Sequence, residues 1–350
     1  MKMIQLDERQ KKVLEFISKN PGVQNKDILN YLRGNISRAT IVRDLVSLYE
    51  NDLIERKGEG RNVGYFEKIS SSLLSFIDPN KYFEKDPDER KLLSKSFNFE
   101  IFKKLNNLFS EQELDELDKL NNSYRKRIKK LSPAILKREW ERMIIELSWK
   151  SSKIEGNTYN LIDTEILIKE NIEAKGHKKE EAIMILNHKK ALDYILESKD
   201  DFKKINWRDI ENIHSLLIQN LGVKKGIRRN AVGILGTNYK PFDNQYQIKE
   251  ALEKMVELVN KTKHPIEKAL IIGLVLPYIQ PFEDGNKRTS RISANAILLA
   301  HDYSLLSFRS INEVDYKKAL ILFYEQNNAR LFKELFVEQF KFSITNYFCR

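Results

Sequence analysis

The sequence predicts a mainly α-helical protein with a few short β-segments. Apolar side chains recur at helical spacing over much of the chain. An uninterrupted apolar run, residues 269–276, is expected to form a buried helix and is too short to span a bilayer. Residues that favour β-structure flank glycine-containing turns at residues 53–66 and 226–237. These patterns together predict a helical core accompanied by two small hairpins.

The composition is that of a globular chain with an excess of positive charge. Its 350 residues allow two or three domains with a sizeable core. The net charge of +11 favours an acidic partner, either a nucleic acid or a nucleotide. Cys349 is the single cysteine, which excludes an internal disulfide. The sequence has no signal-peptide pattern and no membrane-spanning run, so we expect a cytoplasmic protein without a membrane partner.

Residues 5–68 are expected to form three helices followed by a β-hairpin. The three expected helix caps are Asp7, Asn25 and Ser37. The third helix should bury Ile41, Val42, Leu45 and Leu48. The same helix should expose Arg38, Thr40 and Arg43. A basic, glycine-containing tip joins the two expected strands.

This order of elements resembles a winged helix-turn-helix, which we assign to residues 1–70. In such domains the third helix enters the major groove of DNA and the tip of the hairpin contacts phosphate. The residues expected to contact DNA are Arg38, Thr40, Arg43 and Arg61. The alternative is a winged helix that serves as a protein–protein module, because a fold does not determine a function.

Residues 71–131 are interpreted as a linker and helical connection. Within them, residues 111–120 are expected to form a surface helix, and the basic run at 125–130 is typical of a solvated face. His188 and His214, farther along, are interpreted as core or surface residues. The sequence contains no cysteine, histidine and aspartate cluster with metal-ligand spacing.

A long helix is expected from Ser132, which is followed by proline in the first turn, to Gly156. Ser151 and Glu155 lie four residues apart and therefore share one face of this helix. A carboxylate in a last helical turn meets the negative end of the helix dipole. Glu155 is therefore expected to have a cationic partner, although a solvent-facing side chain before the glycine would give the same pattern.

The loop after the apolar run concentrates charge at the start of a further helix. Gly285 and Asn286 provide a sharp turn, and three cations follow it: Lys287, Arg288 and Arg291. Cations are unfavourable at a helix N-terminus unless an anion binds there. Backbone N–H groups and guanidinium groups in this position are typical of a polyphosphate site, beside which Asp284 could hold Mg²⁺. A solvated basic turn with Asp284 as the helix cap is the alternative.

Residues 280–291, Q-P-F-E-D-G-N-K-R-T-S-R, resemble the signature loop of the Fic (Fido) family, H-P-F-x-[DE]-G-N-[GK]-R-x-x-R. Eleven of the twelve positions match, and Gln280 replaces the family histidine. The resemblance covers about residues 133–340 and implies a helical Fic core with a β-hairpin flap, which we assign to residues 132–350. It also implies an inhibitory helix at about 133–156, because residues 151–156 match the motif [ST]-x-x-x-E-[GN].

The resemblance implies a role for each matching residue. Most Fic enzymes transfer AMP from ATP to a serine, threonine or tyrosine hydroxyl of a protein. Asp284 would hold Mg²⁺, and Glu155, with Ser151, would inhibit by pairing with Arg291. The expected nucleotide-binding residues are Gly285, Asn286, Lys287, Arg288, Thr289, Ser290, Arg291 and Tyr316. Tyr316, at the start of a helix expected over residues 316–328, is either an adenine contact or a core tyrosine. The flap residues that would clamp the target by β-augmentation are Ile234, Leu235 and Gly236.

Gln280 lacks a basic lone pair and cannot replace the histidine as general base. Loss of a general base typically slows a reaction by about 10²–10⁴. We therefore predict ATP–Mg²⁺ binding, with Glu155 as inhibitor and weak transfer of AMP to a protein target. The alternative is a catalytically inactive, nucleotide-sensing or DNA-binding transcriptional regulator. DNA and a second copy of the chain are the other expected partners.

Overall fold

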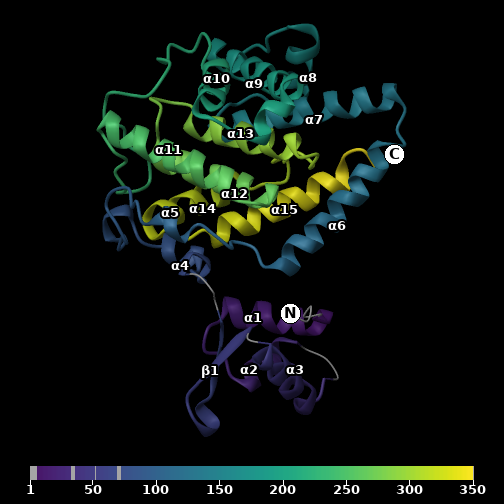
Figure 1. The fold of residues 1–350 in the computed structure, drawn as a ribbon, viewed down its shortest axis with the longest axis vertical. Coiled ribbons are helices and arrows are strands. Elements are labelled where there is room, and N and C mark those ends of the chain that lie inside the picture. The colour runs from purple at the N-terminus through teal and green to yellow at the C-terminus, as the bar shows by residue number, and fades with distance from the viewer. Residues whose placement is uncertain (1–5, 33–35, 52, 69–71, 350) are drawn as a thin grey trace. The chain divides into compact units, whose positions relative to one another are not determined.

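The computed structural model describes residues 6–32, 36–51, 53–68 and 72–349, and of Arg61 only the backbone. The chain divides into two compact units, Met1–Asp86 and Pro87–Arg350 (Figure 1).

The described residues of the first unit contain the three helices and the antiparallel hairpin in the predicted order, followed by a short fourth helix. Its elements are α1 (Glu8–Lys19), α2 (Asn25–Tyr31), α3 (Arg38–Glu50), β1 (Ile54–Lys57), a 3₁₀ turn (Gly60–Asn62), β2 (Gly64–Glu67), a second 3₁₀ turn (Ser72–Leu74) and α4 (Pro79–Phe83). Ile54 pairs with Glu67 across the hairpin. The side chains that form the core are Val13, Ile17, Ile28, Ile41, Leu45, Leu48 and Ile54.

Two details of this unit differ from the prediction. Gln24, rather than Asn25, is the N-cap of α2, because Asp27 accepts a hydrogen bond from the Gln24 N–H at 2.9 Å and so draws Asn25 into the helix. Val42 was expected in the core but is 40% exposed. The buried face of α3 is set by Ile41 and Leu45, and the residue after Ile41 is turned about 100° away from that face.

The second unit is almost entirely helical. Its helices are α5 (Ile101–Lys104), α6 (Glu111–Ile128), α7 (Pro133–Ile154), α8 (Leu161–Glu170), α9 (Lys179–Glu197), α10 (Trp207–Leu217), α11 (Gln245–Lys261), α12 (Pro265–Ile279), α13 (Asn286–Ala300), α14 (Glu313–Gln326) and α15 (Arg330–Asn346), with 3₁₀ turns at Pro87–Glu89 and Lys199–Lys203. None of the helices among the described residues is both long and apolar enough to cross a bilayer.

The paired helices α12 and α13 form the centre of this unit. Figure 1 shows them between α9 and α10 on one side and α14 and α15 on the other. Nearly every side chain of both helices is buried. Gly273 allows a close approach, because a Cβ atom there would lie 3.3 Å from the ring of Phe332 on α15. The two helices that flank the loop at residues 280–285 are therefore fixed in a buried core.

Three elements of the second unit differ from the prediction. The expected surface helix extends to Ile128, which puts the start of the basic run in its last turn, where the helix dipole favours cations. The helix expected from Tyr316 begins at Glu313, because the Asn312 side chain accepts hydrogen bonds from the next N–H groups. The expected flap hairpin is absent: residues 223–240 contain no strand. Its two arms bond elsewhere, Arg228 N–H to the Pro281 carbonyl and Lys240 N–H to the Lys95 carbonyl, both at 2.9 Å.

Candidate functional site

The loop between α12 and α13 reverses the chain through two left-handed residues. Gln280 ends α12 with φ of +53°, and Gly285 precedes α13 with φ of +82°. At Gly285 a Cβ atom would also lie 3.3 Å from Ile218 Cγ2. Glycine is therefore required there, and the turn directs the N-terminus of α13 toward an open cavity.

Both polar atoms of the Gln280 side-chain amide make hydrogen bonds that hold this loop in place. Its Nε2 donates to the Pro277 carbonyl at 2.7 Å, and its Oε1 accepts from Asn286 Nδ2 at 2.8 Å. Its backbone carbonyl accepts from Arg228 Nε at 2.6 Å. The side chain is an internal bridge in this structure, with no basic atom for proton removal.

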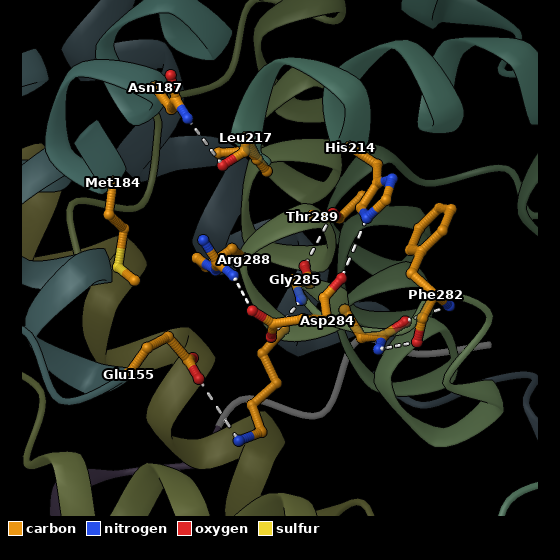
Figure 2. A network of polar contacts seen from close by, with 12 residues as sticks. Glu155, Met184, Asn187, His214, Leu217, Phe282, Asp284, Gly285, Arg288 and Thr289 are labelled. Atoms are coloured by element: carbon orange, nitrogen blue, oxygen red, sulfur yellow. Dashed lines mark hydrogen bonds and ion pairs between the residues drawn. The ribbon is translucent and has the colours of Figure 1, made fainter. Parts of the chain in front are cut away.

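Aromatic stacking fixes the middle of the loop. The His214 ring lies flat on Phe282, with 3.5 Å between ring centroids and a 4° interplanar angle. Burial lowers the pKa of His214 to about 4, so the ring is neutral at pH 7. Its Nε2 lies 3.1 Å from the Asp284 carbonyl and therefore carries the proton that bonds it (Figure 2). His214 is a core residue that supports the backbone at Asp284.

Two guanidinium groups are buried at the start of α13. Arg288 and Arg291 are 2% and 1% exposed. Arg288 Nη2 donates to Asp284 Oδ2 at 2.7 Å (Figure 2). Arg288 Nη1 is buried and has no hydrogen-bond partner in the part of the chain that the structure describes. The Asp284 side chain is 64% exposed, so this partner is solvated. The positive end of the helix dipole and the buried guanidinium groups make this place strongly attractive to an anion.

Glu155, at the end of α7, reaches into this cluster of cations. It accepts from Arg291 Nη2 at 2.9 Å and lies 3.5 Å from Lys287 Nζ. Burial would raise the pKa of Glu155, but the attraction of Arg291 and Lys287 outweighs it and lowers the pKa to about 2. The carboxylate thus already occupies the position of an anion beside Arg291.

Ser151 and a buried histidine complete the clamp on Arg291. Ser151 accepts from Arg291 twice, through Oγ and through its carbonyl, each at 2.9 Å. The Ser151 Oγ lies 2.8 Å from His188 Nε2, and His188 Nδ1 lies 2.9 Å from the Met184 carbonyl. Burial lowers the pKa of His188 to about 3, so its Nδ1–H donates to the carbonyl and Nε2 accepts from the serine.

The sequence did not indicate the roles of His188 and Arg228. His188 was interpreted as a core or surface residue, and only the contact with Ser151 connects it to the site. Arg228 is 1% exposed and donates to the carbonyls of Gln280, Asn230 and Phe242. Its sequence neighbour Arg229 is exposed, so residue type gave no signal that could distinguish the two.

A cavity of about 180 Å³ brings together the three predicted groups of site residues. It is lined by the end of α7, the flap loop (residues 231–240) and the loop before α13, namely by Glu155, Val232, Gly233, Ile234, Leu235, Gln280, Glu283, Asp284, Gly285, Asn286, Lys287 and Arg288. Leu235 lies at the cavity and is 97% exposed.

Other predicted site residues lie behind this surface. Thr289 Oγ1 donates to the Gly285 carbonyl and Ser290 Oγ to the Lys287 carbonyl, which strengthens the first turn of α13. Tyr316 is 1% exposed, with the Arg291 guanidinium 5.5 Å from its ring centroid. It does not line the cavity, and in this structure it occupies a core position.

The residues expected to contact DNA differ in their availability. Arg38 and Arg43 are exposed on α3. Thr40 is half-buried, and its Oγ1 lies 3.0 Å from Ser37 Oγ. The side chain of Arg61 lies outside what the structure describes. The outer face of α3 also exposes Val42, Val46 and Tyr49, at 40%, 48% and 48%.

Comparisons with known proteins identify part of this chain. Residues 204–298 match the Fic/DOC family model, so a Fic/DOC domain lies there. "Protein adenylyltransferase Fic" of Aedes aegypti is 30% identical over 177 residues, which are 48% of this chain and 34% of that protein. The protein of the same name from Nematostella vectensis is 27% identical over 194 residues, 53% of this chain and 44% of that protein. The chain thus spans less than half the length of these relatives.

Solved structures share the fold. Fic-1 (aa134 - 508) from C. elegans aligns with a TM-score of 0.55 and 22% identity over 70% of this chain and 71% of that one. A Fic domain containing signaling protein from Bacteroides thetaiotaomicron aligns with a TM-score of 0.56 and 20% identity over 66% of this chain and 94% of that one. The mainly α-helical fold class with a Fic core is confirmed.

Proposed function

We propose that this chain binds ATP with Mg²⁺ at the N-terminus of α13 and transfers AMP slowly to a hydroxyl group of a protein. The observation that carries the proposal is the buried guanidinium of Arg288. Its Nη1 has no hydrogen-bond partner among the described residues, and its ion pair is with the solvated carboxylate of Asp284. Burying a cation is costly unless an anion compensates it. A phosphate chain would supply that anion at a helix N-terminus, where backbone N–H groups also point outward.

The residues present fit a nucleotide with its metal ion. Mg²⁺ usually takes one or two carboxylates together with phosphate oxygens and water. Asp284 is an exposed carboxylate at the edge of the cavity and could serve as that ligand. When bound, the ion would neutralise charge on the phosphates. Lys287 and Arg288 would position the phosphate chain, and Asn286 would hold the loop in shape through Gln280.

Glu155 accounts for restraint of this activity. The cavity of about 180 Å³ is smaller than the roughly 300–1,000 Å³ typical of pockets for a whole small ligand. The Glu155 carboxylate occupies the place beside Arg291 where a terminal phosphate would bind. We infer that ATP must displace Glu155 before it can bind completely.

The test of binding is calorimetry with ATP and Mg²⁺ on the full chain. Glu155→Ala should lower the Kd at least tenfold. Glu313→Ala is the matched control, because Glu313 also pairs with a cation, Lys150 of α7 at 2.5 Å, but does not line the cavity. Absence of ATP binding in Glu155→Ala would remove the proposal.

The test of transfer is incorporation of labelled AMP into protein. Gln280→His can place one ring N–H on the Pro277 carbonyl and leave the other nitrogen as a base. Labelling should therefore rise by about 10²–10⁴ in Gln280→His combined with Glu155→Ala. Tight ATP binding without any rise would favour a catalytically inactive nucleotide sensor instead.

A second proposed activity is DNA binding by the first unit. It is supported by the order α1–α2–α3–β1–β2 and by the exposed Arg38 and Arg43 on α3. In a band-shift assay with mixed-sequence duplex DNA, Arg38→Ala with Arg43→Ala should abolish binding. Lys12→Ala with Lys175→Ala removes the same charge from exposed positions outside α3 and should leave most of the binding. Equal losses in the two double variants would contradict a role for α3.

A further inference from the structure

The flap loop, residues 231–240, is held at both ends but carries few contacts of its own. Its N-terminal side follows Arg228, which the α12–α13 loop fixes. Within the described structure, the backbone groups of residues 232–235 make no hydrogen bond to the rest of the chain. These groups line the cavity and can pair with an extended segment of another protein.

The C-terminal side of the flap loop is fixed by a segment from far upstream. This segment, residues 87–98, is called the strap. Lys240 N–H donates to the Lys95 carbonyl at 2.9 Å, and Ser96 forms a parallel bridge with Lys240. Asn238 Nδ2 donates to Asp88 Oδ1 at 2.8 Å. The strap therefore occupies one edge of the flap loop.

Arg90 of the strap forms the buried part of this connection together with Glu325 of α14. Its Nη2 donates to the Gly236 carbonyl at 2.5 Å, and its Nη1 lies 3.5 Å from Glu325 Oε2. The side chains of Arg90 and Glu325 are 3% and 0% exposed. Glu325 Oε1 also accepts from Thr237 Oγ1 at 2.6 Å, and Thr237 Oγ1 in turn accepts from the Tyr239 N–H at 3.1 Å.

A buried ion pair adds little to stability compared with apolar packing, but its directional bonds fix geometry. Here the hydrogen bond from Arg90 Nη2 to the Gly236 carbonyl fixes the turn at Gly236, directly after the exposed Leu235. We propose that Arg90 is a positioning residue for the acceptor protein. Through Arg90 the strap holds the flap loop in a conformation that can pair with an extended segment of the acceptor. This inference rests on the proposed transfer to a protein hydroxyl. The strap contributes nothing to the phosphate end of the cavity.

The test begins with Arg90→Ala and hydrogen exchange of the flap amides. The Tyr239 and Lys240 amides should exchange at least tenfold faster, and those of α12 and α13 at unchanged rates. Thr237→Val, a smaller change on the other side of Glu325, should accelerate the same two amides. Arg142→Ala is the matched control, because Arg142 also joins a carboxylate, Glu139, to a backbone carbonyl, that of Asn346.

The second measurement uses the acceptor protein found by labelling, in the Glu155→Ala, Gln280→His background. Arg90→Ala should raise the KM for this acceptor at least fivefold and change the KM for ATP by less than twofold. Unchanged flap exchange, equal acceleration in Arg142→Ala, or an unchanged acceptor KM would each overturn the inference. Failure of the chain to bind ATP would instead refute the proposed function, since the flap exchange is measured without nucleotide.

Discussion

Replacing Glu155 by glutamine should tighten ATP binding and weaken the fold through the same contact. The pKa of Glu155 falls from its ordinary 4.5 to about 2. One pKa unit corresponds to about 1.4 kcal/mol, so the ionised carboxylate gains roughly 3 kcal/mol from its cations after the cost of burial. If ATP must break this contact, Glu155→Gln should improve the affinity for ATP by up to about two orders of magnitude.

The stability of the nucleotide-free chain should change in the opposite direction. Arg291 is buried and would lose its only carboxylate partner among the described residues, which costs about 1–3 kcal/mol. Urea denaturation should report this loss, and ATP at about 100 times its Kd should restore about 2.7 kcal/mol. Glu313→Gln, in the Lys150 pair, should leave the affinity for ATP unchanged. A loss of stability in Glu155→Gln with no gain in affinity would refute the clamp and leave Glu155 a structural residue.

Three further predictions follow from buried groups. Burial lowers the pKa of His214 to about 4 and that of His188 to about 3, below their ordinary 6.5. The unfolded chain therefore binds more protons below pH 6.5, so the free energy of unfolding should fall as the pH is lowered from 6.5 to 4, and His214→Gln should flatten thermal denaturation profiles over that range. Because Glu155 ionises with a pKa of about 2, the clamp should stay closed between pH 5 and 8, and calorimetry should show no tightening of ATP binding on acidification from that residue. Gly285→Ala should cost about 1–3 kcal/mol in urea denaturation, because φ is +82° and the new Cβ would press on Ile218, whereas Gly176→Ala, also at positive φ but in open space, should cost less.

The sequence was sufficient to predict the parts of the site that depend on local chain order. Gly285 and Asn286 predicted the turn, and the three cations after it lie in the first two turns of α13. The pairing of Glu155 with Arg291 was implied by family resemblance rather than by spacing, since the two residues are 136 positions apart. The structure shows the contact, with Arg291 Nη2 2.9 Å from Glu155 Oε1.

The features that were not predicted depend on partners distant in the chain. A hairpin at residues 226–237 was expected from glycines and β-forming residues. Instead, the Arg228 N–H bonds to the Pro281 carbonyl, and the Gly236 carbonyl accepts from Arg90. Arg90 and Glu325 are 235 positions apart and match no motif. A buried charge can be inferred from sequence only when its partner is known, because an isolated arginine usually lies in solvent.

Gln280 departs from the motif at one position, yet its side chain fits the loop. An amide both donates and accepts, so it can bridge the Pro277 carbonyl and Asn286 Nδ2 at the same time. A neutral imidazole could make the same two hydrogen bonds only if its unprotonated nitrogen accepted from Asn286. The lone pair of that nitrogen would then not be available to a general base. The glutamine therefore favours a rigid loop over proton removal, while the hydrogen bond between Arg288 and Asp284, the residues proposed to bind phosphate and metal, does not involve it. Nucleotide binding and transfer should be separable in this chain by substitution of one residue.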